Sequence, residues 1–324
     1  MTKQYDLEEL QRESTIGGEG TVDGTRQIPC IDLHDFESRR EEIRVELWQA
    51  ATEVGFFQLC NHELSSEEIT AAFAQSERFF ALPEQEKARW PLKAGQNAGW
   101  EFRSQVRPST KIADEKESYQ ITVPKMAGLW PSDDDLPEFK QTMLSFESKA
   151  WALGMKILSC FAESLGFDRD FFTQRHDRNA ADYLSTLRLL HYLPLQSAPL
   201  PGQWRAGAHS DFDCLTMVFQ REGQGGLQVC PGKEVDAQAW TDVVPADDLI
   251  TCNIGDMLMR WSDDQLKSTL HRVRMPRAEE SYGPRYSLAF FCQANSNAEI
   301  RSPKNLYPPI LASEYLRQRL AANF

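Results

Sequence analysis

From about Tyr183 onward, the sequence consists of short apolar stretches separated by Gly and Pro residues. Stretches rich in β-branched and aromatic residues are typical of strands, and turn-forming pairs such as Gly225-Gly226 and Pro231-Gly232 lie between them. Many short strands with turns of this kind predict a β-sandwich or a barrel. The expected strands are Leu184–Tyr192, Leu215–Gln220, Leu227–Cys230, Leu249–Asn253, His271–Arg274 and Arg285–Cys292.

The first half of the chain carries helical patterns instead. Apolar residues at a spacing of three or four predict helices over Arg39–Val54 and from Ser65 to about Phe80. A longer apolar stripe runs from Phe139 to Leu165, and we expect this helix to pack on the sheet. The sequence has no internal repeat, so we expect a single domain over 1–324. Its parts would be a helical and short-strand part at 28–180, a β core at 183–293 and a C-terminal segment at 294–324.

Composition narrows the class of protein. The chain has 324 residues and a formal net charge of −13, and we see no clustered Lys and Arg for a nucleic acid to bind. Seven Cys without a Cys-x-x-Cys pair, and no apolar run near the start, favour reduced thiols and a cytoplasmic protein. No stretch approaches the length of a membrane helix. We expect a monomer or homodimer that binds neither nucleic acid nor a membrane.

Three polar residues have the pattern of a metal site. His209 and Asp211 are two positions apart, and His271 follows on a later predicted strand. An isolated His-x-Asp is common on ordinary surfaces. Two imidazoles and one carboxylate on one face of a metal, however, leave the opposite face open for O₂ and a co-substrate, as non-haem Fe(II) oxygenases require.

A second motif follows on the last predicted strand. Arg285, Ser287, Ala289 and Phe291 alternate along it, so their side chains share one face. A guanidinium and a hydroxyl are donors suited to a carboxylate. The pattern predicts an anion-binding site with an aromatic wall beyond it.

Further motifs, together with these residues, resemble those of one enzyme family. They are Ile28-Pro29-Cys30-Ile31-Asp32-Leu33, Gly55-Phe56-Phe57-Gln58-Leu59-Cys60-Asn61-His62, Phe79-Phe80-Ala81-Leu82-Pro83 with Glu86-Lys87, and Asn253-Ile254-Gly255-Asp256. The chain is similar to the non-haem Fe(II), 2-oxoglutarate-dependent oxygenases, in the group that includes isopenicillin N synthase. The resemblance runs from about Ile28 to about Tyr315. It implies a mixed α and β fold with a double-stranded β-helix (jelly-roll) core, backed by N-terminal helices of which one is long.

The resemblance also implies a function. It implies a dioxygenase that uses Fe(II), O₂ and 2-oxoglutarate as co-substrate to hydroxylate, desaturate or rearrange a small metabolite, and we expect a role in secondary metabolism. The implied iron ligands are His209, Asp211 and His271, and the residues implied to hold the distal carboxylate of 2-oxoglutarate are Arg285, Ser287 and Tyr192.

Two other functions stay open at this point. In oxidases similar to isopenicillin N synthase, the Arg-x-Ser pair holds the carboxylate of the substrate, and 2-oxoglutarate is not used. A non-catalytic protein that binds a metal or metabolite is the second alternative. The chain also departs from the family where Asp213 replaces a frequent Gly, so Asp213 is either a surface residue or a substrate contact. The pair Trp204-Arg205 looks specific to a subgroup.

The substrate side follows from strand alternation. If Tyr192 faces the cavity, Leu190 and Arg188 face it too. A buried Arg needs an anion, which would be either a protein carboxylate such as Asp213 or an acidic or phenolic substrate oxygen. We expect Phe212 and Phe291 to supply apolar walls, which favours a small aromatic or anionic substrate. The roles of Arg103 and Arg107 in the loop region before this strand stay open.

The other four histidines are assigned no ligand role. His34 and His176 have polar neighbours and are expected at the surface, and His62 is expected to be structural. His191 should point away from the cavity, because it is adjacent to Tyr192 on one strand.

Overall fold

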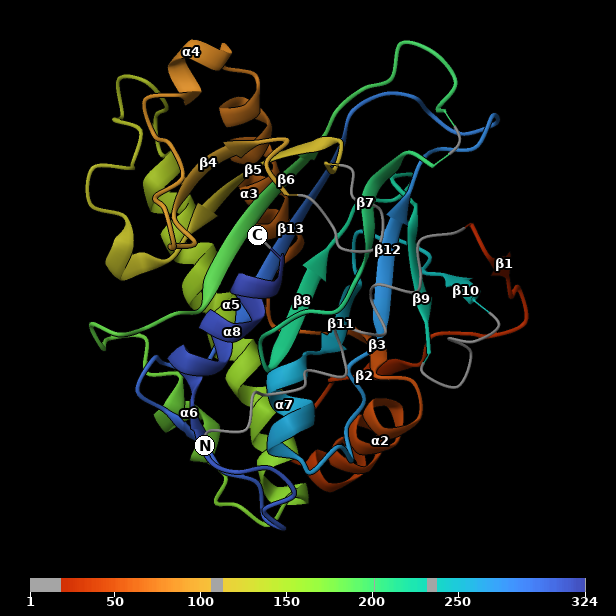
Figure 1. Ribbon diagram of the computed structural model, residues 1–324, viewed down its shortest axis with the longest axis vertical. Coiled ribbons are helices and arrows are strands. Elements are labelled where there is room, and N and C mark those ends of the chain that lie inside the picture. Colours follow the sequence, from red (N-terminus) through yellow and green to blue (C-terminus); the bar gives the residue numbers. More distant parts are fainter. Residues whose placement is uncertain (1–18, 106–112, 201, 232–237, 324) are drawn as a thin grey trace.

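A computed structural model describes residues 19–105, 113–200, 202–231 and 238–323 (Figure 1). Two sheets form its centre. The eight-stranded sheet has the order β2 (Cys30–Asp32), β3 (Phe56–Cys60), β11 (Ile250–Ile254), β8 (Leu215–Phe219), β13 (Arg285–Cys292), β6 (Thr186–Tyr192), β5 (Lys116–Ile121) and β4 (Gly99–Phe102). The five-stranded sheet has the order β1 (Thr21–Val22), β10 (Ala239–Asp242), β9 (Leu227–Cys230), β12 (Leu270–Arg274) and β7 (Trp204–His209). A separate hairpin pairs β14 (Glu299–Ile300) with β15 (Ile310–Leu311).

Helices cover one face of the larger sheet (Figure 1). The helices are α2 (Arg40–Glu53), α3 (Ser66–Phe80), α4 (Glu84–Lys87), α5 (Phe139–Ser164), α6 (Phe171–Arg175), α7 (Asp256–Trp261) and α8 (Ala312–Asn323), with a 3₁₀ turn at Val123–Lys125. No helix within the described residues combines the length and the apolar character needed to span a bilayer.

Side-chain alternation gives the eight-stranded sheet two different faces. On β8, Leu215, Met217 and Phe219 belong to the large core formed with α5, where Phe219 lies edge-on against Phe146 at 4.9 Å. Val218, between them, faces the other way. That inner face meets the five-stranded sheet through a smaller set of residues, which we call the inner cluster. It comprises Phe56, Leu190, Tyr192, Ala206, Leu227, Val229, Val243, Val273 and Ala289, with Ile28, Val54, Val218 and Phe291 packed against it.

The helices have local reasons to start and to pack where they do. The Ser65 side chain accepts a hydrogen bond from the Glu68 backbone, and the Glu68 carboxylate accepts one from the Ser65 backbone, which is a complete capping box at the start of α3. Helix α5 approaches β13 closely at Gly154, where a Cβ atom would meet the Cys292 sulfur at 2.5 Å. A larger residue at this position would push the helix away from the sheet.

The structure changes several details of the sequence prediction. Asp133–Asp135 followed by Pro137 predict the start of the long helix, but the helix begins at Phe139 because the acidic run forms a turn instead. Strands β7 and β10 and helices α7 and α8 were not anticipated. His176 is fully buried, so the expectation of a surface position was wrong.

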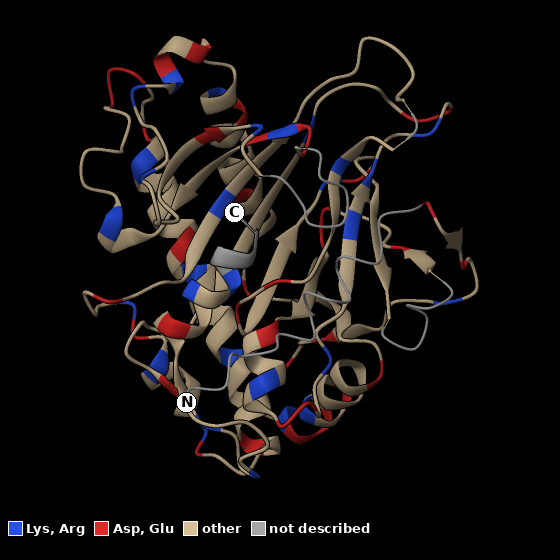
Figure 2. Cartoon of the chain, viewed as in Figure 1, with Lys and Arg blue, Asp and Glu red and all other residues tan. Residues whose placement is uncertain are grey.

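Charged residues of both signs are scattered over the helices and loops, whereas the strands carry few (Figure 2). Basic residues nevertheless interrupt β6 and β12 (Figure 2). A charge inside a sheet is costly unless another group pairs with it, so each of these positions needs an interaction partner.

Candidate functional site

The two histidines of the predicted triad lie opposite each other on neighbouring strands. His209 ends β7 and is in register with His271 on β12, and their ring centroids are 4.3 Å apart. Asp211 follows directly, with Oδ1 3.9 Å from His209 Nε2 and Oδ2 3.6 Å from His271 Nε2. One ligand atom from each residue lies within 4.8 Å of the others, so the three could hold one metal ion.

The imidazoles are oriented by their own backbones. His209 Nδ1 lies 2.8 Å from the carbonyl oxygen of Gly207, and His271 Nδ1 lies 3.2 Å from that of Thr269. A carbonyl can only accept, so each Nδ1 carries the proton and each Nε2 keeps its lone pair for a metal. Phe56 packs edge-on against the His271 ring at 5.4 Å and limits its rotation.

The carboxylate is held by two residues that the sequence did not reveal as partners. Asp211 Oδ2 accepts hydrogen bonds from the Thr216 hydroxyl at 2.6 Å and from the Asn253 amide at 2.8 Å. Thr216 and Asn253 are paired across β8 and β11, so they present their side chains together. These bonds fix the carboxylate in one orientation, as outer-shell bonds do for metal ligands.

Asp213 is buried, which excludes the surface role considered for it. Both of its carboxyl oxygens lie close to Thr216 Oγ, at 3.2 and 3.3 Å, while the single hydroxyl hydrogen of Thr216 is directed at Asp211 Oδ2, 2.6 Å away. Burial, followed by the nearby charge of Asp211, holds its pKa well above the ordinary value of 3.8. A carboxyl in this setting favours the neutral form, which limits the negative charge beside the triad.

The residues expected to bind 2-oxoglutarate also come together. Arg285 is buried, with its guanidinium 4.7 Å from the centroid of the Tyr192 ring and its Nη1 3.4 Å from Ser287 Oγ. Its Nε donates to the carbonyl oxygens of Gln224 and Gly225 at 2.9 and 3.1 Å. Burial lowers the pKa of Arg285, and Tyr192 opposes this shift. The inner cluster connects this end of the site to the triad, since it contains both Tyr192 and the Phe that packs on His271.

Arg188 faces the same interior, as alternation predicted. Its guanidinium lies 5.0 Å from the Phe291 ring centroid, and its Nη2 donates to Gln120 Oε1 at 2.7 Å. The considered ion pair with Asp213 is not present among the described residues, where the Asp213 oxygens lie close to Thr216 Oγ. Phe212 lies under the guanidinium of Arg319 at 4.5 Å.

A chain of hydrogen bonds continues from Arg188 into the β4–β5 edge of the sheet. Gln120 Nε2 donates to Glu101 Oε1 at 3.1 Å, and Ser118 Oγ donates to the same atom at 2.6 Å. Gln120 therefore accepts from Arg188 and donates to Glu101, so its amide orientation is fixed. The sequence predicted short strands at Gly99–Arg103 and Lys116–Ile121, which the structure has as β4 and β5, with substrate contacts expected only from the loop between them. It did not identify Gln120, because strand register was needed to place Gln120 opposite Arg188.

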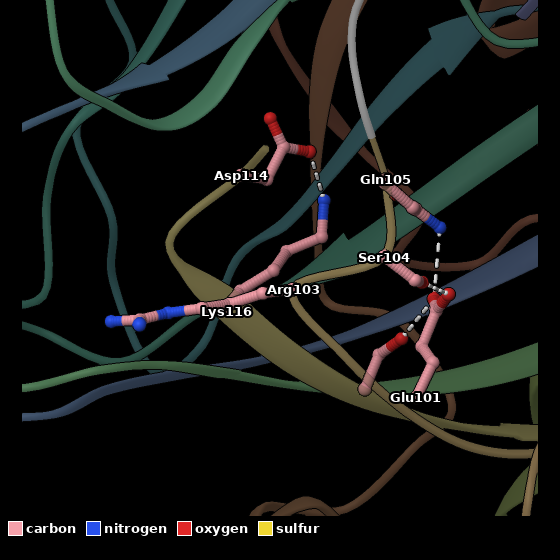
Figure 3. Close-up of a pocket in the computed structure, with 7 residues that line it drawn as sticks. Glu101, Arg103, Ser104, Gln105, Asp114 and Lys116 are labelled. Carbon is pink, nitrogen blue, oxygen red and sulfur yellow. Dashed lines mark hydrogen bonds and ion pairs between the residues drawn. The ribbon is translucent and has the colours of Figure 1, made fainter. Parts of the chain in front are cut away.

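Figure 3 shows the small pocket at this edge, where the Ser104 and Gln105 side chains point at the Glu101 carboxylate. Arg103, one of the residues left open, is half exposed and pairs with Glu115 at 2.7 Å. In Figure 3 its side chain extends away from Glu101. Arg107 lies outside the described residues.

Comparisons with known proteins agree with this arrangement. Residues 28–141 match the model of the N-terminal region of the non-haem dioxygenase of morphine synthesis, and residues 184–294 match that of the 2OG-Fe(II) oxygenase superfamily. The proline hydroxylase buaE of Petromyces alliaceus is 30% identical, with 85% of this chain and 90% of the relative covered. A full-length Neurospora crassa protein, solved in complex with alpha-KG (2-oxoglutarate), is 32% identical, with a TM-score of 0.82 over 94% of this chain and 99% of that protein. The chain belongs to the 2OG-Fe(II) oxygenase superfamily.

The same Neurospora crassa protein has also been solved with alpha-KG and thymine, at 31% identity and a TM-score of 0.81 over 94% of this chain and 100% of that protein. As a member of the superfamily, the present protein is an Fe(II)- and 2-oxoglutarate-dependent dioxygenase with O₂ as its other co-substrate. The non-catalytic alternative and the oxidase without 2-oxoglutarate are thereby set aside. Its mixed α and β fold of two sheets matches the jelly-roll architecture of these oxygenases.

Proposed function

We propose that His209, Asp211 and His271 bind the catalytic Fe(II) of this dioxygenase. The observation that carries the assignment is the convergence of three ligand atoms within 4.8 Å, with each imidazole turned by its own backbone so that Nε2 is available. Bound iron would couple the oxidative decarboxylation of 2-oxoglutarate to succinate and CO₂ with oxidation of the substrate by O₂. The protein residues orient the reactants and keep water out.

The distal carboxylate of 2-oxoglutarate is assigned to Arg285, Ser287 and Tyr192. The guanidinium, the Ser hydroxyl and the Tyr ring are adjacent, and Arg285 has no carboxylate partner among the described residues. A buried guanidinium of this kind needs an anion. The carboxylate end of the co-substrate supplies it.

The substrate is a small, flat metabolite that carries an oxygen able to accept a hydrogen bond or to bear negative charge. Phe291 offers an aromatic face. The guanidinium of Arg188 lies beside it and offers charged donors, and its hydrogen bond to Gln120 holds its orientation. We also propose Phe212 as a second apolar wall of the substrate site. The Neurospora crassa relative with bound thymine fits this class, since thymine is planar and has two carbonyl oxygens. Thymine is therefore the first compound to test, with free proline as the alternative that the buaE relative suggests.

The test measures succinate and oxidised product together, with Fe(II), 2-oxoglutarate and each candidate substrate. The wild-type protein should form both in equal amounts with its true substrate. Arg188→Ala should still bind Fe(II) and 2-oxoglutarate but lose the coupled product, leaving slow succinate formation without oxidation of the substrate. An unchanged kcat/KM for the true substrate in this variant would show that Arg188 is structural.

A further inference from the structure

A second buried arginine, Arg205, lies near the residues proposed to bind the distal carboxylate of 2-oxoglutarate. Arg205 is on β7, in the sheet opposite Arg285, and is only 5% exposed. The loops before β7 and β13 run side by side, joined by a hydrogen bond from the Leu195 backbone to Tyr282 (Figure 1). Arg205 Nη2 donates to the carbonyl oxygen of Gly283 at 3.2 Å. The Arg205 side chain therefore contacts the segment that directly precedes Arg285.

The described residues do not satisfy the whole guanidinium of Arg205. Its Nε is buried and has no hydrogen-bond partner among them. Among the described residues no carboxylate pairs with it, and Glu280, the acidic side chain whose charge influences it, gives both oxygens to Arg274 at 2.6 Å. A buried donor without an acceptor is costly, and a buried charge without a counter-charge is more so.

The charges of Arg205 and Arg285 act on each other. Burial first, and then the charge of Arg285, lower the pKa of Arg205 to about 10. Arg205 therefore remains protonated at neutral pH, so two like charges share a dry region of the protein. Tyr192 interacts with both guanidiniums, which places all three side chains at the same end of the inner cluster. An anion bound there would remove the repulsion and satisfy the donors.

We propose that Arg205 is a second arginine that binds the distal carboxylate of 2-oxoglutarate, from the sheet opposite Arg285. The inference rests on the proposed role of Arg285 at this end of the site. Each guanidinium can donate hydrogen bonds to one side of a carboxylate. Because Arg285 and Arg205 belong to opposite sheets, the carboxylate would be bound from both sides between them. Arg205 then contributes to the preference for a 2-oxo acid with a second carboxylate over one without.

The test uses the Fe(II)-loaded protein under nitrogen, so that 2-oxoglutarate binds without turnover. The Kd for 2-oxoglutarate and the Tm with and without it are measured for wild type and Arg205→Met. We expect the Kd of the variant to rise at least tenfold. Its Tm without 2-oxoglutarate should equal or exceed that of wild type, because an unpaired, repelled charge has been removed. The rise in Tm that 2-oxoglutarate produces should shrink accordingly.

The matched control is Arg272→Met. Arg272 is a buried arginine on the neighbouring strand β12, but it lies between the rings of Trp204 and Trp240, at 4.3 and 3.8 Å, and away from the inner cluster. Its loss should lower the Tm and leave the Kd unchanged. If Arg205→Met shows this same pattern, Arg205 is structural and the inference is overturned.

Two further variants, Arg205→Lys and Arg285→Met, distinguish the possible reasons for a negative result. If Arg205→Met fails to fold, Arg205→Lys replaces it, and its Kd must still rise severalfold because a single ammonium cannot replace the paired N–H donors of the guanidinium. An unchanged Kd in that variant also overturns the inference. Failure of the underlying site assignment has a different signature, since Arg285→Met would then bind 2-oxoglutarate as wild type does.

Discussion

At the scale of single residues, the proposed iron site depends on side chains that are not themselves proposed ligands. Thr216 and Asn253 both donate to Oδ2 of Asp211, whereas no side-chain hydrogen bond to Oδ1 is found among the described residues. An oxygen that already accepts two hydrogen bonds is a weaker ligand than one that accepts none. The pair of bonds therefore selects which oxygen of Asp211 would face the metal.

Removal of either donor should weaken metal binding. We expect Asn253→Leu and Thr216→Val each to raise the Kd for Fe(II) about 10- to 100-fold, the usual cost of losing an outer-shell partner. The measurement is an anaerobic Fe(II) titration. Thr251→Val is the matched control, because Thr251 lies two residues from Asn253 on β11 but bonds to Gln220 instead. Equal Fe(II) affinity in all three variants would contradict the role given to Oδ2.

The sequence indicated the three proposed ligands but not the residues that hydrogen-bond to them, for a physical reason. His209, Asp211 and His271 have a spacing and chemistry that few other sites require, so they can be found without coordinates. Thr216 and Asn253 are ordinary strand residues, and only the register between β8 and β11 brings them to the same carboxylate. Register depends on long-range pairing that a local pattern does not contain.

At the scale of elements, the C-terminal helix α8 contacts the segment between His209 and Asp211, two of the proposed ligands. Arg319 is fully buried and pairs with Asp256 of α7, with its Nη2 2.6 Å from Oδ2. The same nitrogen lies 3.2 Å from the hydroxyl of Ser210, which is located between His209 and Asp211. Helix α8 thus contacts Ser210, the residue between two of the proposed ligands, although the helix is distant from them in sequence.

Breaking this buried pair should cost far more than breaking a surface pair on the same helix. We expect Arg319→Met to lower the free energy of unfolding by about 3–5 kcal/mol, because the Asp256 carboxylate is left buried without its partner. Arg317→Met removes an exposed arginine paired with Glu314 and should change the free energy of unfolding little, because solvent screens the pair. Urea denaturation measures both. Similar losses in the two variants would argue against Arg319 as an anchor.

The elements themselves were predicted unevenly. The stripe from Phe139 to Leu165 is long and strictly periodic, so α5 could be found from its pattern alone. Strand β7 was missed because Trp204–His209 contains Gly, Ala and Arg in place of β-branched residues. Pairing with β12, across a register irregularity, makes it a strand. Local propensity does not detect an element that tertiary pairing creates.

At the scale of the whole molecule, one apolar core spans most of the chain. It joins residues from Ile31 to Tyr315 and includes the faces of α2, α3 and α5 as well as the outer face of the eight-stranded sheet. We propose on this basis that residues 1–324 form a single catalytic domain. A change in any part of this core should then be transmitted to the stability of the whole protein.

His176 connects several parts of this core. It follows α6, its Nδ1 lies 2.8 Å from the carbonyl oxygen of Phe172, and its Nε2 lies 3.3 Å from that of Cys292 on β13. The indole of Trp151 on α5 donates to its backbone oxygen at 2.8 Å. Burial lowers the pKa of His176 from 6.5 to about 4, against the opposing effect of the two carbonyls. The folded protein therefore holds this imidazole neutral at physiological pH.

The lowered pKa of His176 predicts how stability depends on pH. Below pH 6.5 the unfolded chain protonates this imidazole while the folded protein does not, so the contribution present above pH 6.5 is lost as the pH falls towards 4. The loss should be about 1.4 kcal/mol per pH unit, or roughly 3 kcal/mol in total. His176→Gln should remove this part of the slope in urea denaturation between pH 4 and 7, whatever its effect at pH 7. His34→Gln, at an exposed histidine, should keep the wild-type slope, and an identical slope in both variants would show that His176 titrates normally in the folded protein.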